Sequence, residues 1–201
     1  MGELGYGEGV DTAQFKQPRD VKVDSKGNIV IADADNSRIQ IFDPEGKFMR
    51  MYGKKGTAPG DMLRVHALEY GKGPGEFQDP HGLASDANGD IFVSNYWGSC
   101  QKFTGDGKYL FEFAVPEKEA FTHAHAINGD RWGNVYLMAR DKDNRNAIVK
   151  YNNNGTLVTT WPALRPVKEW GVKAAIVDVD GTIYVGVESH DIVGIEVYAE
   201  Q

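Results

Sequence analysis

The residues best suited to chemistry in this chain are four side chains at matching positions in four copies of one sequence phrase. Each stands eight residues before the glycine that closes its phrase, and the four are Arg19, His81, His125 and Lys173. Neutral imidazole nitrogens are common ligands of zinc-like ions. A guanidinium can hold a carboxylate through two parallel hydrogen bonds. The set therefore predicts either a divalent metal, such as zinc, on His81 and His125 or an anionic ligand held by the cations.

A metal at this position needs more than two imidazoles, because zinc sites in proteins use three or four protein ligands. The third ligand would come from His123, from His66 or from another chain. In a catalytic interpretation Arg19 would hold a substrate carboxylate, the metal would polarise an oxygen and Tyr96 would exchange a proton. In the alternative interpretation the histidines only bind backbone groups or water. The sequence leaves open whether the chain is an enzyme.

Further side chains suited to binding are expected at the same end of the predicted sheets. Tyr96 and Trp97 are adjacent aromatics on one loop, and Arg140 follows the corresponding strand of the next copy. Aromatic and arginine side chains dominate binding energy at protein surfaces, although these rings could also pack on the neighbouring copy. We expect Arg19, Trp97, Arg140 and Lys173 to bind a ligand, which would be a peptide, a protein or an anionic small molecule.

The repeated phrase itself predicts a β-hairpin. It consists of an alternating apolar run, an aspartate, two variable residues, a glycine and a second apolar run. The aspartate can accept hydrogen bonds from the turn amides, and the glycine takes the positive φ that ends the turn. The four turns lie at 24–27, 86–89, 130–133 and 178–181. A calcium loop is the alternative at 178–181, but the twelve-residue ligand spacing of an EF-hand is missing.

Each copy continues into a third strand and, in three copies, a fourth, which gives an antiparallel meander of the size of a propeller blade. We therefore predict an all-β fold, a single β-propeller domain over 1–201 built from about four four-stranded antiparallel blades. The predicted parts are blade 1 at about 15–53, an insertion at about 54–70, blade 2 at about 71–115, blade 3 at about 120–162 and blade 4 at about 170–199.

The first two copies resemble NHL repeats. The resemblance rests on FKQPRDVKVD at 15–24, GNIVIAD at 27–33, NSRIQIF at 36–42 and the stretch 71–93, while the third and fourth copies are looser. It implies NHL-type blades, commonly six, which would need ~270 residues at ~45 each. The fourth copy stops after its third strand, so we expect a small ring, a partial propeller, or a homo-oligomer that completes the open blade.

The phrase Pro80-His81-Gly82-Leu83 resembles the metal-binding phrase of peptidyl-hydroxyglycine amidating lyases, which are NHL-type propellers. The resemblance implies three such histidines on a zinc ion, with an arginine and a tyrosine for chemistry. Here Arg19 and Lys173 occupy two of the four matching positions. We favour a binding scaffold that acts through the channel-mouth face, which is the face at the mouth of the central channel where the four matching positions are expected. The alternative is a metal-dependent lyase or hydrolase that uses His81 and His125.

The composition limits the classes of partner that the chain is expected to bind. The net charge of −7 and the pI near 5.2 disfavour nucleic acid, because phosphate backbones are repelled. No run approaches the roughly 18 apolar residues of a membrane span. Residues 1–9 show no export signal, which predicts a cytoplasmic protein or an exported one whose signal has been removed. The single cysteine, Cys100, cannot form an internal disulfide, so we predict a packing role for it.

Overall fold

The structure is a computed structural model in which every described regular element is a β-strand, as the sequence predicts. It describes residues 9, 11–55, 73–77, 79–96, 99–114, 121–141, 146–162, 172–178, 180–188 and 193–198. At some strand positions, 121–125, 140–141 and 172–174 among them, only the backbone is described. The described part contains no helix that could cross a membrane.

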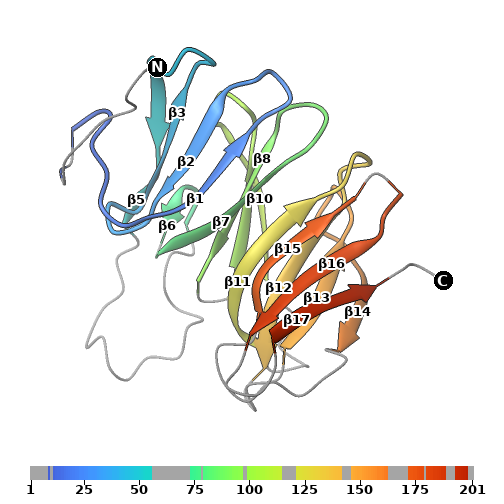
Figure 1. Cartoon of the computed structure of the whole chain (residues 1–201). Coiled ribbons are helices and arrows are strands. Elements are labelled where there is room, and N and C mark those ends of the chain that lie inside the picture. The colour runs from blue at the N-terminus through green and yellow to red at the C-terminus, as the bar shows by residue number, and fades with distance from the viewer. Residues whose placement is uncertain are drawn as a thin grey trace.

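The strands form successive antiparallel sheets that correspond to the predicted blades (Figure 1). Blade 1 consists of β1 (Pro18–Val23), β2 (Ile29–Asp33), β3 (Arg38–Phe42) and β4 (Phe48–Tyr52). Blade 2 consists of β7 (Pro80–Ser85), β8 (Ile91–Asn95), β9 (Ser99–Phe103) and β10 (Tyr109–Ala114). Blade 3 consists of β11 (Phe121–Gly129), β12 (Val135–Asp141), β13 (Asn146–Tyr151) and β14 (Leu157–Pro162). Blade 4 has three described strands, β15 (Val172–Val177), β16 (Ile183–Glu188) and β17 (Val193–Tyr198).

A short parallel pair joins the first two blades. Its strands are β5 (Lys54–Lys55) and β6 (Glu76–Phe77). The first two residues of the predicted insertion therefore belong to a strand pair, and 56–72 lie outside the described residues. Phe77 is fully buried, so this pair delivers an aromatic side chain to the boundary between blades 1 and 2.

The aspartate and glycine turns adopt the predicted hairpin geometry. In blade 1 the Oδ1 atom of Asp24 accepts hydrogen bonds from the Lys26 and Asn28 amides at 2.8 and 2.9 Å. Asp86, Asp130 and Asp178 accept turn amides through Oδ1 in the same way. The turn glycines all have left-handed φ values, 84° at Gly27, 82° at Gly89, 83° at Gly133 and 90° at Gly181. The carboxylates are therefore engaged in the turns, which supports the structural interpretation over a calcium loop.

Each of the first three blades packs one of its faces on the following blade. The face of each blade that carries Val21, Leu83, Ile127 or Ala175 is called its front, and the opposite face is called its back. The back of blade 1 and the front of blade 2 share a cluster made of Val30, Ala32, Ile39, Ile41, Phe77, Leu83, Ile91, Val93 and Phe103. Equivalent clusters join blade 2 to blade 3 and blade 3 to blade 4. Burying these apolar groups is the main stabilising term in the fold.

The inner strands β1, β7, β11 and β15 lie side by side in chain order (Figure 1). Figure 1 shows blade 1 and blade 4 apart from each other, at the two ends of this row. Val21 on the front of blade 1 is 57% exposed and Ile195 on the back of blade 4 is 71% exposed. Of the predicted arrangements, the four blades therefore form an open arc in the described chain and not a closed small ring.

Loss of a turn carboxylate should destabilise the propeller. Asp24→Ala removes an acceptor from two backbone amides, and we expect a loss of about 2 kcal/mol in the free energy of unfolding. Asp24→Asn should cost less, because its amide oxygen still accepts. Urea denaturation followed by circular dichroism measures both changes.

The matched control for the turn variants is Asp35→Ala. Within the described residues, the Asp35 carboxylate makes one interaction, a 4.0 Å ion pair with partly exposed Lys16, so its removal should change stability by less than about 0.5 kcal/mol. Equal losses for Asp24→Ala and Asp35→Ala would contradict the capping role.

Candidate ligand site at the channel mouth

The four matching positions share an irregularity in the inner strands. In β1, Pro18 and Asp20 face consecutive residues of β2, so Arg19 is the extra residue of a one-residue bulge. The ladder shifts in the same way at His81 in β7, His125 in β11 and Lys173 in β15. The positions are thus structurally equivalent, as predicted.

Arg19 and His81 approach the same carboxylate oxygen. Asp79 Oδ1 lies 3.6 Å from Arg19 Nε and 3.7 Å from His81 Nδ1. Both distances are typical of loose ion pairs and exceed those of good hydrogen bonds. The arrangement joins a cation from blade 1 to an imidazole and a carboxylate from blade 2. The sequence analysis predicted Arg19 and His81 here, but it missed Asp79.

A backbone hydrogen bond between Asp79 and Tyr96 holds these two residues beside His81. Asp79 has a left-handed φ of 53°, and its carbonyl oxygen accepts the Tyr96 amide at 3.0 Å. The Tyr96 ring lies 5.2 Å from the His81 ring at an angle of 44°. We call Arg19, Asp79, His81 and Tyr96 the channel-mouth cluster. A left-handed aspartate beside functional groups is a strained conformation that a binding site can retain.

The carboxylates around the cluster have opposite pKa shifts. Burial acts to raise the pKa of Asp79, but His81 and Arg19 together outweigh it and hold the pKa below its ordinary value. Burial raises the pKa of Asp20, although the Leu83 amide and Lys22 oppose the rise. Asp79 is therefore the carboxylate that stays charged most readily at the channel mouth.

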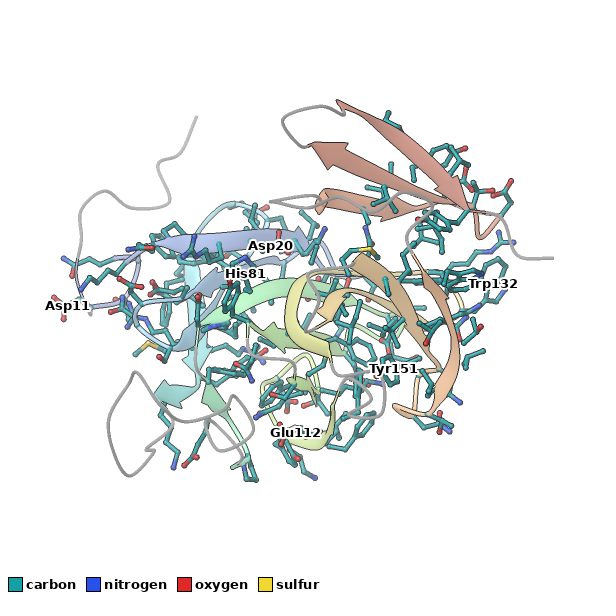
Figure 2. The ribbon with its side chains drawn as sticks, turned by 90° about the horizontal axis from the view of Figure 1, so that it is seen from below. Asp11, Asp20, His81, Glu112, Trp132 and Tyr151 are labelled. Atoms are coloured by element: carbon teal, nitrogen blue, oxygen red, sulfur yellow. The ribbon has the colours of Figure 1, made fainter. Side chains whose placement is uncertain are left out.

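Asp20 fixes the inner strands of blades 1 and 2 together next to the cluster. Its Oδ2 atom accepts the Leu83 amide from β7 at 2.8 Å, while Oδ1 accepts the Val21 amide. Figure 2 shows Asp20 and His81 close together where β1 and β7 meet. Gly82 brings β7 close to β11 as well, because a Cβ there would lie 2.9 Å from Ile127 Cγ2. The cluster is therefore built on closely packed strands.

Several predicted site residues cannot be placed in this cluster. Trp97 and His66 lie outside the described residues, as do the side chains at the strand positions His123, His125, Arg140 and Lys173. In the described part of the chain, no group of three histidine, cysteine, aspartate or glutamate side chains is close enough to hold a metal. The backbone of His125 stands at the matching bulge of the neighbouring inner strand, beside β7. The predicted metal site thus has one described ligand candidate, His81.

A separate cavity of about 280 Å³ lies at the outer strands of blades 1 and 2. Its lining includes Tyr52 from β4, Tyr109 from β10 and Lys54 from β5. Within the described residues the buried Tyr52 hydroxyl has no hydrogen-bond partner, and burial raises its pKa well above the ordinary value. The cavity contains none of the residues of the channel-mouth cluster. The cluster combines a guanidinium, a carboxylate, an imidazole and a phenol, so it is the better candidate for a functional site.

Cys100 has the packing role predicted for it. Its side chain is fully buried in the cluster between blades 2 and 3. Burial raises the pKa of the Cys100 thiol well above its ordinary value. A thiol that stays protonated is a poor nucleophile and a poor metal ligand, so Cys100 has no part in the site.

Comparisons with known proteins agree with this architecture. The model of the NHL repeat matches residues 15–42. The chain is 30% identical over 186 residues to peptidyl-glycine alpha-amidating monooxygenase B of Xenopus laevis. It is 41% identical over 63 residues to the protein brain tumor of Drosophila melanogaster. Among solved structures, the WD40 β-propeller domain of Doa1 superposes with a TM-score of 0.63 at 15% identity, which reflects the fold alone.

The matches cover very different shares of these proteins. The amidating monooxygenase match spans 89% of this chain and 20% of the relative, and the brain tumor match spans 31% and 6%. The Doa1 match spans 94% of this chain and 53% of that chain. The chain therefore corresponds to part of each relative.

The two shifted carboxylates give pH dependences of opposite sign. Because the pKa of Asp79 is lower in the folded state, its contribution to stability is present above the ordinary carboxyl range and is lost as the pH falls through the folded pKa. The stability advantage of the native chain over Asp79→Asn should therefore shrink as the pH falls from about 5 to about 2.5, through the ordinary carboxyl range and below it. Urea unfolding at a series of pH values measures it.

Asp20→Asn is the internal control for this experiment. The pKa of Asp20 is raised in the folded state, so the native chain should lose stability relative to Asp20→Asn as the pH rises from the ordinary carboxyl range through the folded pKa. The same sign for both variants would contradict the assignment of Asp79 as the carboxylate held charged by Arg19 and His81.

Proposed function

Because the chain is an NHL-repeat β-propeller, we propose that it is a binding scaffold whose channel mouth holds the anionic group of a peptide, protein or small molecule. The observation that carries this proposal is the convergence of Arg19 Nε and His81 Nδ1 on one oxygen of Asp79. The three groups come from two blades, and Arg19 and His81 stand at bulges, where strands commonly aim side chains into binding sites.

The geometry around Arg19 suits a carboxylate ligand. Asp79 Oδ1 lies 3.6 Å from Arg19 Nε, and within the described residues no other carboxylate forms an ion pair with this guanidinium. The Arg19 side chain is 41% exposed, so a ligand can reach it. A guanidinium recognises a carboxylate through paired N–H donors, and such charge-assisted bonds are stronger than neutral ones.

The rings beside Arg19 favour a ligand whose anionic group adjoins an apolar or aromatic one. His81 and Tyr96 present two tilted rings 5.2 Å apart next to the ion pair. Aromatic faces supply contact area at low cost in side-chain entropy. A peptide that ends in an aromatic residue with a free carboxylate combines both features and is a suitable probe.

Peptide binding tests the scaffold proposal. A fluorescein-labelled peptide whose last residue is phenylalanine should bind with the free carboxylate about tenfold more tightly than with a C-terminal amide, because the amide loses a charge-assisted bond to Arg19. Arg19→Ala should abolish that preference, and Arg19→Lys should retain part of it. Fluorescence anisotropy measures both peptides on each variant.

The control for peptide binding is Arg131→Ala. Arg131 lies in the hairpin of blade 3 and stacks on Trp132, which Figure 2 shows well away from His81. This variant should bind both peptides as the native chain does. No binding of either peptide by the native chain, or an equal loss with Arg131→Ala, would reject the proposal.

A metal-dependent lyase or hydrolase is the second candidate function. It is favoured by the similarity to the amidating monooxygenase over most of this chain. Metal-binding histidines usually direct their other ring nitrogen to a carboxylate, and Asp79 Oδ1 lies 3.7 Å from His81 Nδ1. His81 and His125 would hold the metal, which when bound would polarise a substrate oxygen. Arg19 would orient a substrate carboxylate and Tyr96 would supply a proton-transfer group.

Metal content distinguishes the two functions. Protein purified without an affinity tag and analysed by mass spectrometry should carry about one zinc or similar ion per chain if the second candidate is correct. The His81→Ala, His125→Ala double variant should lose that ion, while the Arg131→Ala control should keep it. Native protein that takes up no divalent metal even after incubation with zinc would reject the lyase or hydrolase and leave the scaffold.

A further inference from the structure

The channel-mouth cluster contains a carboxylate whose capacity for hydrogen bonds is unused. Within the described residues, neither oxygen of Asp79 accepts a hydrogen bond. The distances from Oδ1 to Arg19 Nε and His81 Nδ1, 3.6 and 3.7 Å, are too long for one. Oδ1 is buried, so the 32% exposure of this side chain comes from its other atoms. Since a carboxylate can accept several hydrogen bonds, a ligand can complete the coordination of Asp79.

The other carboxylate at this blade boundary, Asp20, is already engaged by the backbone. Its Oδ2 atom accepts the Leu83 amide and its Oδ1 atom accepts the Val21 amide, both at 2.8 Å. These bonds hold the inner strands of blades 1 and 2 together. Asp20 therefore has a structural role, and Asp79 is the acid of the two that can serve a ligand.

The backbone conformation at Asp79 does not require an acid. Gln17 is the matching residue of the first copy, and its left-handed φ of 48° is close to the 53° of Asp79. Both residues stand two positions before the bulge residue of their inner strand, Arg19 in β1 and His81 in β7. A neutral amide thus supports the same backbone turn in blade 1. The negative charge in blade 2 is therefore available for a role other than folding.

The charges of the cluster favour a ligand that carries both signs. Burial acts to raise the pKa of Asp79, but His81 and Arg19 outweigh it and hold the pKa below its ordinary value, so Asp79 stays negative. A ligand carboxylate that reaches the Arg19 guanidinium comes close to Asp79, whose Oδ1 atom is 3.6 Å from Nε. Two carboxylates at such short range repel each other. A positive group beside the ligand carboxylate offsets this repulsion, because it pairs with Asp79.

We propose that the preferred ligand of the channel mouth is a free aromatic α-amino acid, a ligand class that rests on the scaffold function proposed above for the same cluster. The ligand carboxylate binds the Arg19 guanidinium, and the ligand ammonium donates to Asp79. An α-amino acid carries these two groups on one carbon atom, which matches a guanidinium and a carboxylate that lie 3.6 Å apart. The aromatic side chain of the ligand packs beside the His81 and Tyr96 rings, which are 5.2 Å apart.

Binding of L-phenylalanine and two analogues tests the proposal. N-acetyl-L-phenylalanine keeps the carboxylate and the ring but has no ammonium, and phenethylamine keeps the ammonium and the ring but has no carboxylate. The native chain should bind L-phenylalanine at least about tenfold more tightly than either analogue, because each analogue loses one charge-assisted bond. Asp79→Asn keeps the side-chain shape without the charge, so it should reduce the preference over N-acetyl-L-phenylalanine to less than about twofold. Isothermal titration calorimetry at neutral pH measures all three affinities.

The matched control is Asp106→Asn. Asp106 is an exposed acid in the hairpin between β9 and β10, at the end of blade 2 opposite the channel mouth. The variant removes the same charge as Asp79→Asn and should bind all three compounds as the native chain does. Circular dichroism confirms that both variants fold.

Failure of the amino-acid ligand can be told apart from failure of the scaffold function. If N-acetyl-L-phenylalanine binds the native chain as tightly as L-phenylalanine, the amino-acid ligand is overturned and the carboxylate site at Arg19 stands. The same holds if the native chain binds the peptide with a free C-terminal carboxylate but not L-phenylalanine. A native chain that binds neither the peptide nor any of the three compounds would reject both proposals. An unchanged preference in Asp79→Asn would overturn the role of Asp79.

Discussion

The structure depends on the packing of each blade against its neighbours. A four-stranded sheet with apolar groups on each side cannot stand alone in water, because covering one face leaves the other exposed. In this chain the back of each of the first three blades is covered by the front of the next, with side chains such as Val30, Leu83 and Tyr136 fully buried. The packing forces the inner strands to lie side by side. It also fixes which residues of different blades can meet.

The channel-mouth cluster follows from that packing. Arg19 belongs to blade 1, and Asp79, His81 and Tyr96 belong to the start and first loop of blade 2. They meet because β1 and β7 are adjacent and because Asp20 binds the Leu83 amide across the boundary. The bulge at each matching position then releases one side chain per blade from the regular ladder. A repeated irregularity in a repeated element thus produces a row of functional groups at one end of the arc.

The features that the sequence predicts are those set by neighbouring residues along the chain. The aspartate and glycine turns give the strand boundaries within a residue or two, and counting from the turn glycine finds Arg19 and His81 at equivalent positions. Asp79 was not found because the matching position of the first copy is Gln17, so no repeated acid marks it, and about sixty residues separate it from Arg19. The bulges were missed because alternation assumes an unbroken ladder. Exposure is also invisible locally, since Val21 stands at the same position as Leu83, yet Val21 is 57% exposed and Leu83 is fully buried.

The channel-mouth cluster depends on one blade boundary. All of its described groups belong to blades 1 and 2. The same boundary is closed by the apolar cluster that includes Val30 and Leu83 and by the hydrogen bond from the Leu83 amide to Asp20. A change that loosens this boundary therefore acts on the geometry of Arg19 and His81 as well as on stability, so recognition and folding draw on the same contacts.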